Sequence, residues 1–159
     1  MLRQKIKIGG IIQNRNLAKI GVMSIPDRPG VASAIFGALA ARGVNAPFIV
    51  HTIDLNNLDS IVICIARDDL AAALEALDTV KDAVGAKEVV HEREVGMISI
   101  FGPHFGQRPG IAGDMFSALA SVGVNILAIS TSISSLCCVV DVGDMDAAVQ
   151  ALEQAFELP

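Results

Sequence analysis

The sequence predicts an α+β protein made of two similar βαββαβ modules. Residues 28–45 (RPGVASAIFGALAARGVN) return 80 positions later as residues 108–125 (RPGIAGDMFSALASVGVN), and eleven of the 18 aligned positions are identical. A repeat of this length is too long for a solenoid and suits a small α+β unit. Strand-like and helix-like stretches also follow one another in the same order around both copies. We therefore expect one unit of structure, duplicated within the 159 residues.

The first module reads as strand, helix, strand, strand, helix and strand. Residues 18–25 (AKIGVMSI) are rich in strand formers and end at the chain breaker PDRPG. A helix is expected over residues 31–42, where apolar residues recur at helical spacing, and Gly43 suits position C′ beyond its end. The remaining expected elements are strands over 45–53 and 60–66, an amphipathic helix over 68–84 and a strand over 87–92.

The second module follows the same plan but lacks a final strand, because only three residues follow Phe156. Its expected elements cover residues 95–101, 111–122, 125–132, 136–142 and 144–156. The segment 5–13 (KIKIGGIIQ) is strand-like and is not needed by the first module. We predict that this N-terminal strand completes the second sheet, so that both modules are ferredoxin-like. The predicted domains are residues 14–93 and residues 94–159 together with strand 5–13.

The composition argues for a packed, paired protein. Hydrophobic residues make up 52% of the chain, charged residues make up 18%, and the mean hydropathy is +0.55. Modules of this size bury a limited fraction of their surface, so packing against a partner is the expected source of further stability. A homodimer is therefore predicted.

Charge and hydropathy exclude two classes of partner. The net charge is −5 and no basic stretch is concentrated enough to follow a phosphate backbone, so no nucleic acid is expected. No apolar run approaches the ~20 residues that span a bilayer, and the first residues show no signal peptide. The protein is expected to be cytoplasmic, with no membrane partner.

No catalytic or metal-binding constellation is recognisable. The phosphate-loop, GxSxG and HExxH patterns are missing from the sequence. His51, His91 and His104 fall in different expected elements without ligand spacing. The cysteines at positions 64, 137 and 138 lack CxxC spacing and are interpreted as reduced core thiols. We expect no catalytic residues, no cofactor and no metal.

The repeated loop before the first helix of each module is the main candidate site. Gly30 and Gly110 would let a ligand approach the backbone, and the free amides of the first helical turn favour an anion such as a carboxylate. The alternative is that Arg-Pro-Gly merely ends a strand and starts a helix. Asn45 and Asn125 offer a donor and an acceptor to an amino acid, although a turn asparagine also bonds its own backbone.

The repeated motifs resemble a known regulatory family. PDRPG, GVN and ISTS at this tandem spacing, within residues 19–66 and 97–132, resemble the pair of ACT domains at the C-terminal end of aspartate kinases. The likeness covers nearly the whole chain, including the leading segment KIKIGGIIQNRNLAK. It implies two ACT modules that bind lysine or threonine at seams between paired subunits, and that inhibit the kinase making aspartyl phosphate from ATP and aspartate.

The partners implied by the resemblance are a free amino acid, a second copy of the chain, and an aspartate kinase catalytic domain or subunit. The biological role implied is feedback control of amino-acid biosynthesis, lysine biosynthesis included. The alternative is a free-standing tandem ACT sensor that regulates another enzyme or a transcription factor.

Carried over residue by residue, the resemblance implies two effector sites. The first comprises Ile25, Asp27, Pro29, Gly30, Val31, Ala32 and His51, facing Asn125 and Ile126 of the second module. The second comprises Gly106, Gly110, Ile111, Ala112 and Thr131, facing Asn45 and Ala46.

Departures from the family pattern fall on these sites. His51 stands where the family often has glutamine, HFGQRPG stands for MRSHPG, and TSISSLCC stands for TSEIRIS. We therefore expect the fold to transfer better than the identity of the ligand. The counterpart of Asp27 in the second loop is the neutral Gln107, so the first site is expected to hold an ammonium group more tightly.

Overall fold

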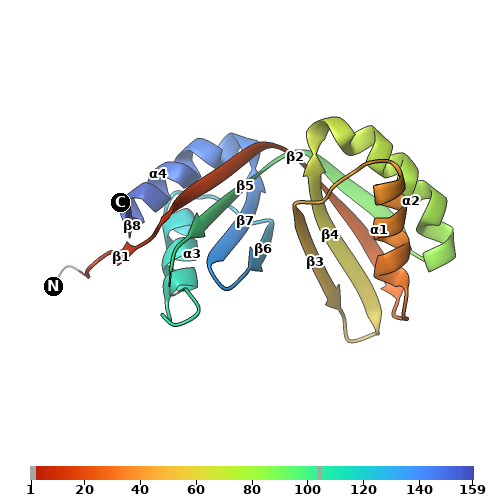
Figure 1. Ribbon diagram of the computed structural model, residues 1–159, viewed down its shortest axis with the longest axis horizontal. Helices are drawn as coiled ribbons and strands as arrows, with labels where there is room; N and C mark the ends of the chain where they lie inside the picture. The colour runs from red at the N-terminus through yellow and green to blue at the C-terminus, as the bar shows by residue number, and fades with distance from the viewer. Residues whose placement is uncertain (1–2, 104) are drawn as a thin grey trace. The chain divides into compact units, whose positions relative to one another are not determined.

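The chain divides into two compact units, each a small sheet with two helices (Figure 1). The computed structural model describes residues 3–103 and 105–159. One unit is Asn16–Glu94, and the other is Val95–Pro159 together with the N-terminal segment through Arg15. The predicted internal duplication of an α+β module is confirmed, and the histidine at position 104 lies outside the described residues.

The unit Asn16–Glu94 has the strand order β3-β4-β2-β5. It contains most of β2 (Gly10–Pro26), then α1 (Val31–Ala41), β3 (Phe48–Ile53), β4 (Leu58–Ala66), a 3₁₀ turn (Arg67–Asp69), α2 (Leu70–Val84) and the start of β5 (Glu88–Phe101). β4 pairs antiparallel with both β2 and β3. This is the strand order of a βαββαβ ferredoxin-like sheet, as predicted.

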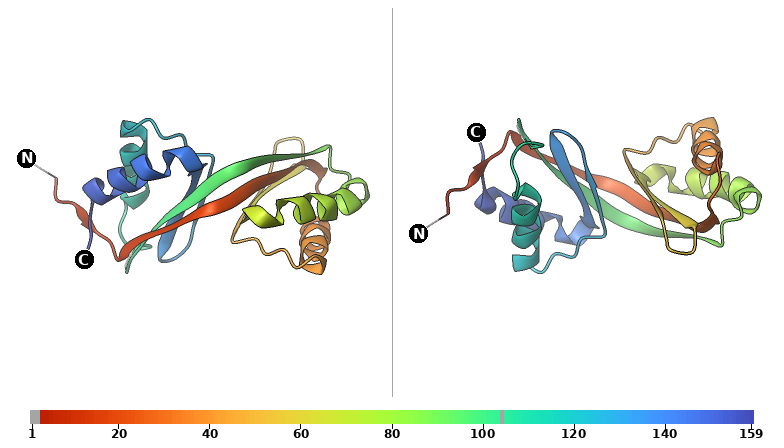
Figure 2. Two further views of the ribbon diagram at one scale, coloured as in Figure 1. Left: turned by 90° about the horizontal axis from the view of Figure 1, so that it is seen from above. Right: turned by 90° about the horizontal axis from the view of Figure 1, so that it is seen from below.

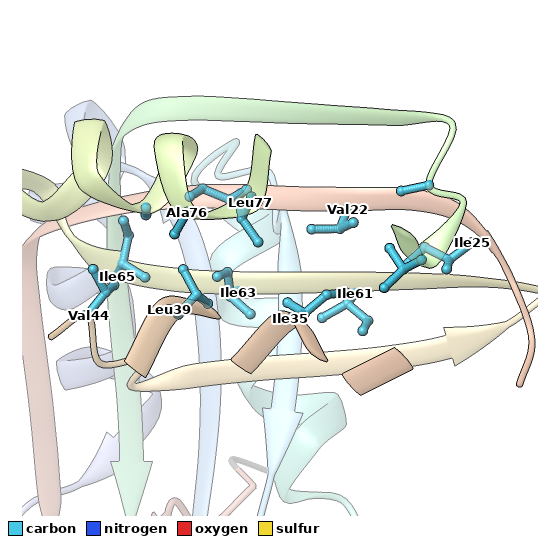
Figure 3. Packing of buried hydrophobic residues seen from close by; sticks show 14 of the residues in the cluster. Val22, Ile25, Ile35, Leu39, Val44, Ile61, Ile63, Ile65, Ala76 and Leu77 are labelled. Atoms are coloured by element: carbon cyan, nitrogen blue, oxygen red, sulfur yellow. The ribbon is translucent and has the colours of Figure 1, made fainter. Parts of the chain in front are cut away.

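The core of this unit lies between its sheet and its helices. Alternate residues of β4 point to the helix side, where Ile61, Ile63 and Ile65 pack against Ile35 and Leu39 of α1 (Figure 3). All five side chains are at most 1% exposed. The period-two pattern of β4 therefore fixes which of its residues face the helices.

The other unit repeats this plan with the strand order β2-β5-β7-β6. It contains the rest of β5, α3 (Ile111–Ser121), β6 (Ala128–Thr131), β7 (Ser135–Asp141), a 3₁₀ turn (Val142–Asp144), α4 (Met145–Ala155) and β8 (Phe156–Glu157). Its core joins the helices to the sheet through Ile98, Ile100, Met115, Leu119 and Leu152.

The N-terminal segment supplies the fourth strand of this second sheet, as predicted. The Gly9 N–H donates to the Phe101 carbonyl at 2.6 Å, and β2 is the neighbour of β5 (Figure 2). A side chain at Gly10 would collide with the Phe101 ring at 2.8 Å, so glycine permits this close approach. A short strand β1 (Ile6–Lys7) also pairs in parallel with β8.

Several element boundaries differ from the prediction. The strands expected over 5–13 and 18–25 are divided differently in the structure. β1 covers only Ile6–Lys7, and β2 (Gly10–Pro26) joins the rest of both segments through the polar stretch Asn14-Arg15-Asn16. The strand expected from residue 45 begins at Phe48, because Pro47 has no N–H for a ladder and the Asn45 side chain accepts from the Ala46 N–H. Phe156 leaves the helix and enters β8.

Burial lowers the reactivity of the Cys64 and Cys138 thiols. Burial raises the pKa of both the Cys64 and the Cys138 thiol to about 12, which keeps them protonated at neutral pH. Cys137 is half-buried and accepts a hydrogen bond from the Ser99 hydroxyl at 2.8 Å. All three thiols are free in the structure; Cys64 and Cys138 are buried, as expected of core thiols, whereas Cys137 is only half-buried.

We predict that a thiol reagent at pH 8 labels at most Cys137 in the folded protein. A raised pKa leaves little thiolate at Cys64 and Cys138, and both side chains are fully buried. Titration with a chromogenic disulfide should release about one equivalent in native buffer and three in guanidinium chloride. Rapid release of three equivalents without denaturant would contradict this account of the core.

The N-terminal segment should contribute measurably to stability. Ile8 is 5% exposed within the core of the Val95–Pro159 unit, whereas Ile12 is 55% exposed. Ile8→Ala should lower the free energy of unfolding by about 2–4 kcal/mol, because it removes buried methyl groups and leaves a cavity. Ile12→Ala, the matched control, should change it by less than about 0.5 kcal/mol. Equal effects in urea unfolding would show that the segment is not packed as described.

Candidate functional site

Both candidate loops end at a glycine in a left-handed conformation. Gly30 has φ 96° and Gly110 has φ 95°, and each immediately precedes its helix, α1 or α3. A side chain at such a φ is strained, so glycine is required there by the backbone itself. Pro29 and Pro109 lie one residue before the N-cap and two residues before the first helical position.

The first turn of each helix keeps its amides available. The first intrahelical bonds run from Ala34 N–H to the Gly30 carbonyl and from Asp114 N–H to the Gly110 carbonyl, both at 2.9 Å. Neither N-cap has a side-chain hydrogen bond. The amides before these bonds are thus free of intrahelical partners and carry the positive end of the helix dipole. Such a turn attracts an anion.

A cavity of about 210 Å³ opens on the second loop. It is smaller than the roughly 300–1,000 Å³ of pockets that take drug-sized ligands, and suits a small metabolite. All five loop and strand residues predicted for the second site line this cavity: Gly106, Gly110, Ile111, Ala112 and Thr131. The remaining lining residues are Phe105, Arg108, Ser132 and Leu136.

The chemistry of the cavity suits a carboxylate. Arg108 adds a guanidinium to the amides of the α3 N-terminus. The Thr131 hydroxyl lies 3.2 Å from the Ser135 carbonyl, to which it donates. Outside the cavity lining, Arg3 forms an ion pair at 3.1 Å with Asp114 in the first turn of α3. Sequence reasoning missed Arg108, although its identity with Arg28 across the repeat was a usable signal.

The first loop arranges equivalent residues differently. Arg28 donates to the Ala83 carbonyl at the end of α2, so its guanidinium is engaged. Asp27 is exposed, and its N–H donates to the Asn57 carbonyl at 3.1 Å. Ile25 is fully buried and lies in β2 after a bulge, one residue before the strand ends at Pro26. Val31 is buried and Ala32 half-buried at the start of α1, while Pro29 and Gly30 are exposed.

His51 lies beside a buried carboxylate. Its Nε2 is 3.0 Å from Asp59 Oδ2, and Asp59 is 1% exposed. The other oxygen, Oδ1, is buried without a hydrogen-bond partner among the described residues. The predicted set included His51 but missed Asp59, an acidic residue that directly precedes the largely apolar stretch SIVICIA.

The repeated asparagines lie at the far ends of the helices. The chain leaves α1 through Gly43 (φ 69°), whose N–H bonds the Ala40 carbonyl while Val44 N–H bonds that of Leu39, as a Schellman motif requires. Asn45 Oδ1 accepts from the Ala46 N–H at 3.0 Å, so the turn interpretation is confirmed for this residue.

Within one unit, an asparagine cannot meet its own loop. The 11 residues of α1 span about 16 Å between Gly30 and the chain that leads to Asn45. Asn125 is exposed and Ile126 half-buried at the corresponding end of α3. Neither Asn45 nor Asn125 therefore lies at the loop of its own unit.

The described residues contain neither a cluster of metal-binding side chains nor a helix that could cross a membrane. No group of three or more histidine, cysteine, aspartate and glutamate side chains could hold a metal ion there. Among the helices of that same part of the chain, none is long and apolar enough to cross a membrane.

Comparison with known proteins adds family-level evidence. Two ACT-domain family models match residues 20–82 and 98–156. The chain is 36% identical over 151 residues to an aspartokinase of Pseudomonas aeruginosa, covering 95% of this chain and 37% of that protein. It thus spans little more than a third of the curated relatives that it matches.

Solved structures of an aspartate kinase and of an aspartate kinase regulatory subunit are also similar to this chain. The regulatory subunit of aspartate kinase from Thermus thermophilus, in a ligand-free form, has 32% identity and a TM-score of 0.87, covering 94% of this chain and 99% of that one. Aspartate kinase from Synechocystis has 34% identity and a TM-score of 0.91, covering 99% of this chain and 29% of that one.

Proposed function

This chain belongs to the family of ACT-domain pairs that regulate aspartate kinases, and we propose that it binds a free amino acid and thereby controls such a kinase. The observation that carries the proposal is the cavity on the second loop, where Arg108 joins the uncapped amides of α3. These groups together complement the α-carboxylate that all amino acids share.

We propose feedback inhibition by threonine or lysine as the specific role. The ligand's carboxylate would meet the amides of Ile111 and Ala112, and the Thr131 edge of the cavity would face its side chain. On the first loop, Asp27 would hold the ammonium group. The regulated activity, transfer of phosphate from ATP to aspartate, would belong to an aspartate kinase catalytic domain or subunit.

We further propose that two copies of the chain pair through their sheet edges. β3 and β6 are edge strands. Exposed isoleucines occupy equivalent positions in the two units: Ile49 and Ile53 in β3, Ile129 in β6 and Ile133 in the turn that follows β6. Leu55, in the turn after β3, is fully exposed. An unpaired apolar edge is a ready template for another strand. Pairing would also let Asn125 and Ile126, or Asn45 and Ala46, reach a loop of a different unit.

Calorimetry with threonine and lysine tests the ligand proposal. Arg108→Gln should weaken binding at the second loop by about 10-fold to 100-fold, because a charge-assisted hydrogen bond to the carboxylate is lost. Arg28→Gln is the matched control and should leave that affinity unchanged, because its guanidinium already bonds the Ala83 carbonyl. Failure of all twenty amino acids to bind, or equal losses in both variants, would contradict the proposal.

Sedimentation tests the pairing. The parent chain should be a dimer at micromolar concentration, and Ile49→Lys should shift it toward monomer by placing a charge on the apolar edge. Val122→Lys, at a residue equally exposed but at the end of α3, should not. A parent chain that stays monomeric with and without amino acid would rule out sites built at a dimer seam.

A further inference from the structure

The N-terminal segment lies against both ends of the second loop, the stretch that leads from β5 to α3. At the start of this loop, a side chain on Gly102 would lie 3.1 Å from the Gly9 nitrogen and 3.5 Å from the Ile8 Cα. At its end, Arg3 Nη2 lies 3.6 Å from the position that a Cβ on Gly110 would occupy. The segment is therefore a neighbour of the candidate site as well as a strand of the sheet.

The fold holds this segment beside α3. The Ile8 N–H donates to the Glu157 carbonyl at 3.0 Å, and the Ile8 side chain is 5% exposed in the core. Ahead of β1, residues 3–5 line a hollow of about 310 Å³ together with Ser117 and Ala118 of α3. Arg3 is thus carried on a backbone that already runs along the helix.

The guanidinium of Arg3 is divided between two neighbours. Nη1 lies 3.1 Å from Asp114 Oδ1, whereas Nη2 faces Gly110. Among the described residues, Arg3 makes no other ion pair or hydrogen bond. A guanidinium carries five N–H donors in a fixed fork. With Nη1 held by Asp114, Nη2 can still donate to a ligand at the first amides of α3.

Asp114 makes this arginine necessary for an anion site. It lies in the first turn of α3, where a carboxylate interacts with the positive end of the helix dipole and repels a second anion. Pairing with Arg3 neutralises that charge. The equivalent position in α1 is Ala34, and the first turn of α1 carries no acidic residue. The second copy of the loop therefore has a repulsion that Arg3 offsets and the first copy lacks.

We propose that Arg3 is a further ligand-binding residue of the second loop, positioned by Asp114, and that an amino acid bound there ties the N-terminal segment to α3. Nη2 would donate to the ligand's carboxylate at the end of α3, while Arg108 would hold the same group from the cavity. The inference rests on the proposed function and adds a residue and a coupling to its second site. By linkage, a ligand that Arg3 helps to bind must in turn stabilise the docked segment.

An amide-resolved NMR titration with L-threonine and L-lysine tests the contact. The Ile111 and Ala112 amides report affinity at the second loop separately from the first. Arg3→Gln should weaken that affinity by at least about 5-fold, because a charge-assisted hydrogen bond is lost and Asp114 is left unpaired. Lys7→Gln is the matched control: it removes an equal charge from the same segment, where Lys7 is 76% exposed and pairs with Glu157 at 3.6 Å. It should change the affinity by less than about 2-fold.

A double-mutant cycle tests the positioning role of Asp114. In an Asp114→Asn background, Arg3→Gln should weaken binding by less than about 2-fold, because Arg3 is then no longer held at Gly110. The direct effect of Asp114→Asn on the ligand is common to both members of this comparison and cancels.

Hydrogen exchange of the Ile8 amide tests the coupling. Saturating ligand should slow this exchange in the parent chain, and should slow it less in Arg3→Gln. Equal affinity in Arg3→Gln and the parent, equal losses in Arg3→Gln and Lys7→Gln, an undiminished loss in the Asp114→Asn background, or unchanged Ile8 exchange would each overturn the inference while leaving amino-acid binding intact. If neither amino acid shifts the Ile111 and Ala112 amides of the parent, the proposed function fails at the second loop and this inference fails with it.

Discussion

The left-handed conformation of Gly30 and Gly110 is the constraint on which both candidate sites depend. A φ near +95° at the last residue of each loop leads the chain into the helix, at a position where a side chain would be strained. The turn is made without a capping side chain, so the first amides of α1 and α3 stay available. In the core of the Asn16–Glu94 unit, buried isoleucines such as Ile35 of α1 and Ile63 of β4 pack the helix against the sheet. A site for an anion thus follows from the way the fold makes this connection.

Duplication preserved that backbone and let the side chains around it change. Arg28 is engaged by a helix carbonyl, whereas its twin Arg108 lines a cavity. His51 lies within hydrogen-bond distance of the buried Asp59 carboxylate, whereas Thr131 donates to the Ser135 carbonyl. The shared backbone suits the part common to all amino acids, and the changed side chains are where two sites could distinguish ligands. One chain could in this way respond to more than one metabolite.

Most of the fold, but only part of the candidate site, could be predicted from the sequence. The repeat, the helical stripes and the missing fourth strand after Phe156 are local patterns, so the modules and the crossing N-terminal strand could be predicted. The unbroken course of β2 could not, because Asn14-Arg15-Asn16 reads as a loop by composition although it lies in a strand. The family resemblance named five residues that line the second cavity, a grouping that depends on tertiary structure. The pairing of His51 with Asp59 needs the register of a hairpin, which eight positions of sequence separation do not reveal.

The most direct test of the central claim is to follow backbone amide chemical shifts of the chain during titration with lysine and with threonine. If amino acids bind through the free helix amides, the largest changes should fall on Val31 and Ala32, on Ile111 and Ala112, and on the glycines before them. Amides on the outer face of α2 should hardly move. Saturable shifts confined to other surfaces, or no shifts at millimolar amino acid, would contradict an effector role for these two loops.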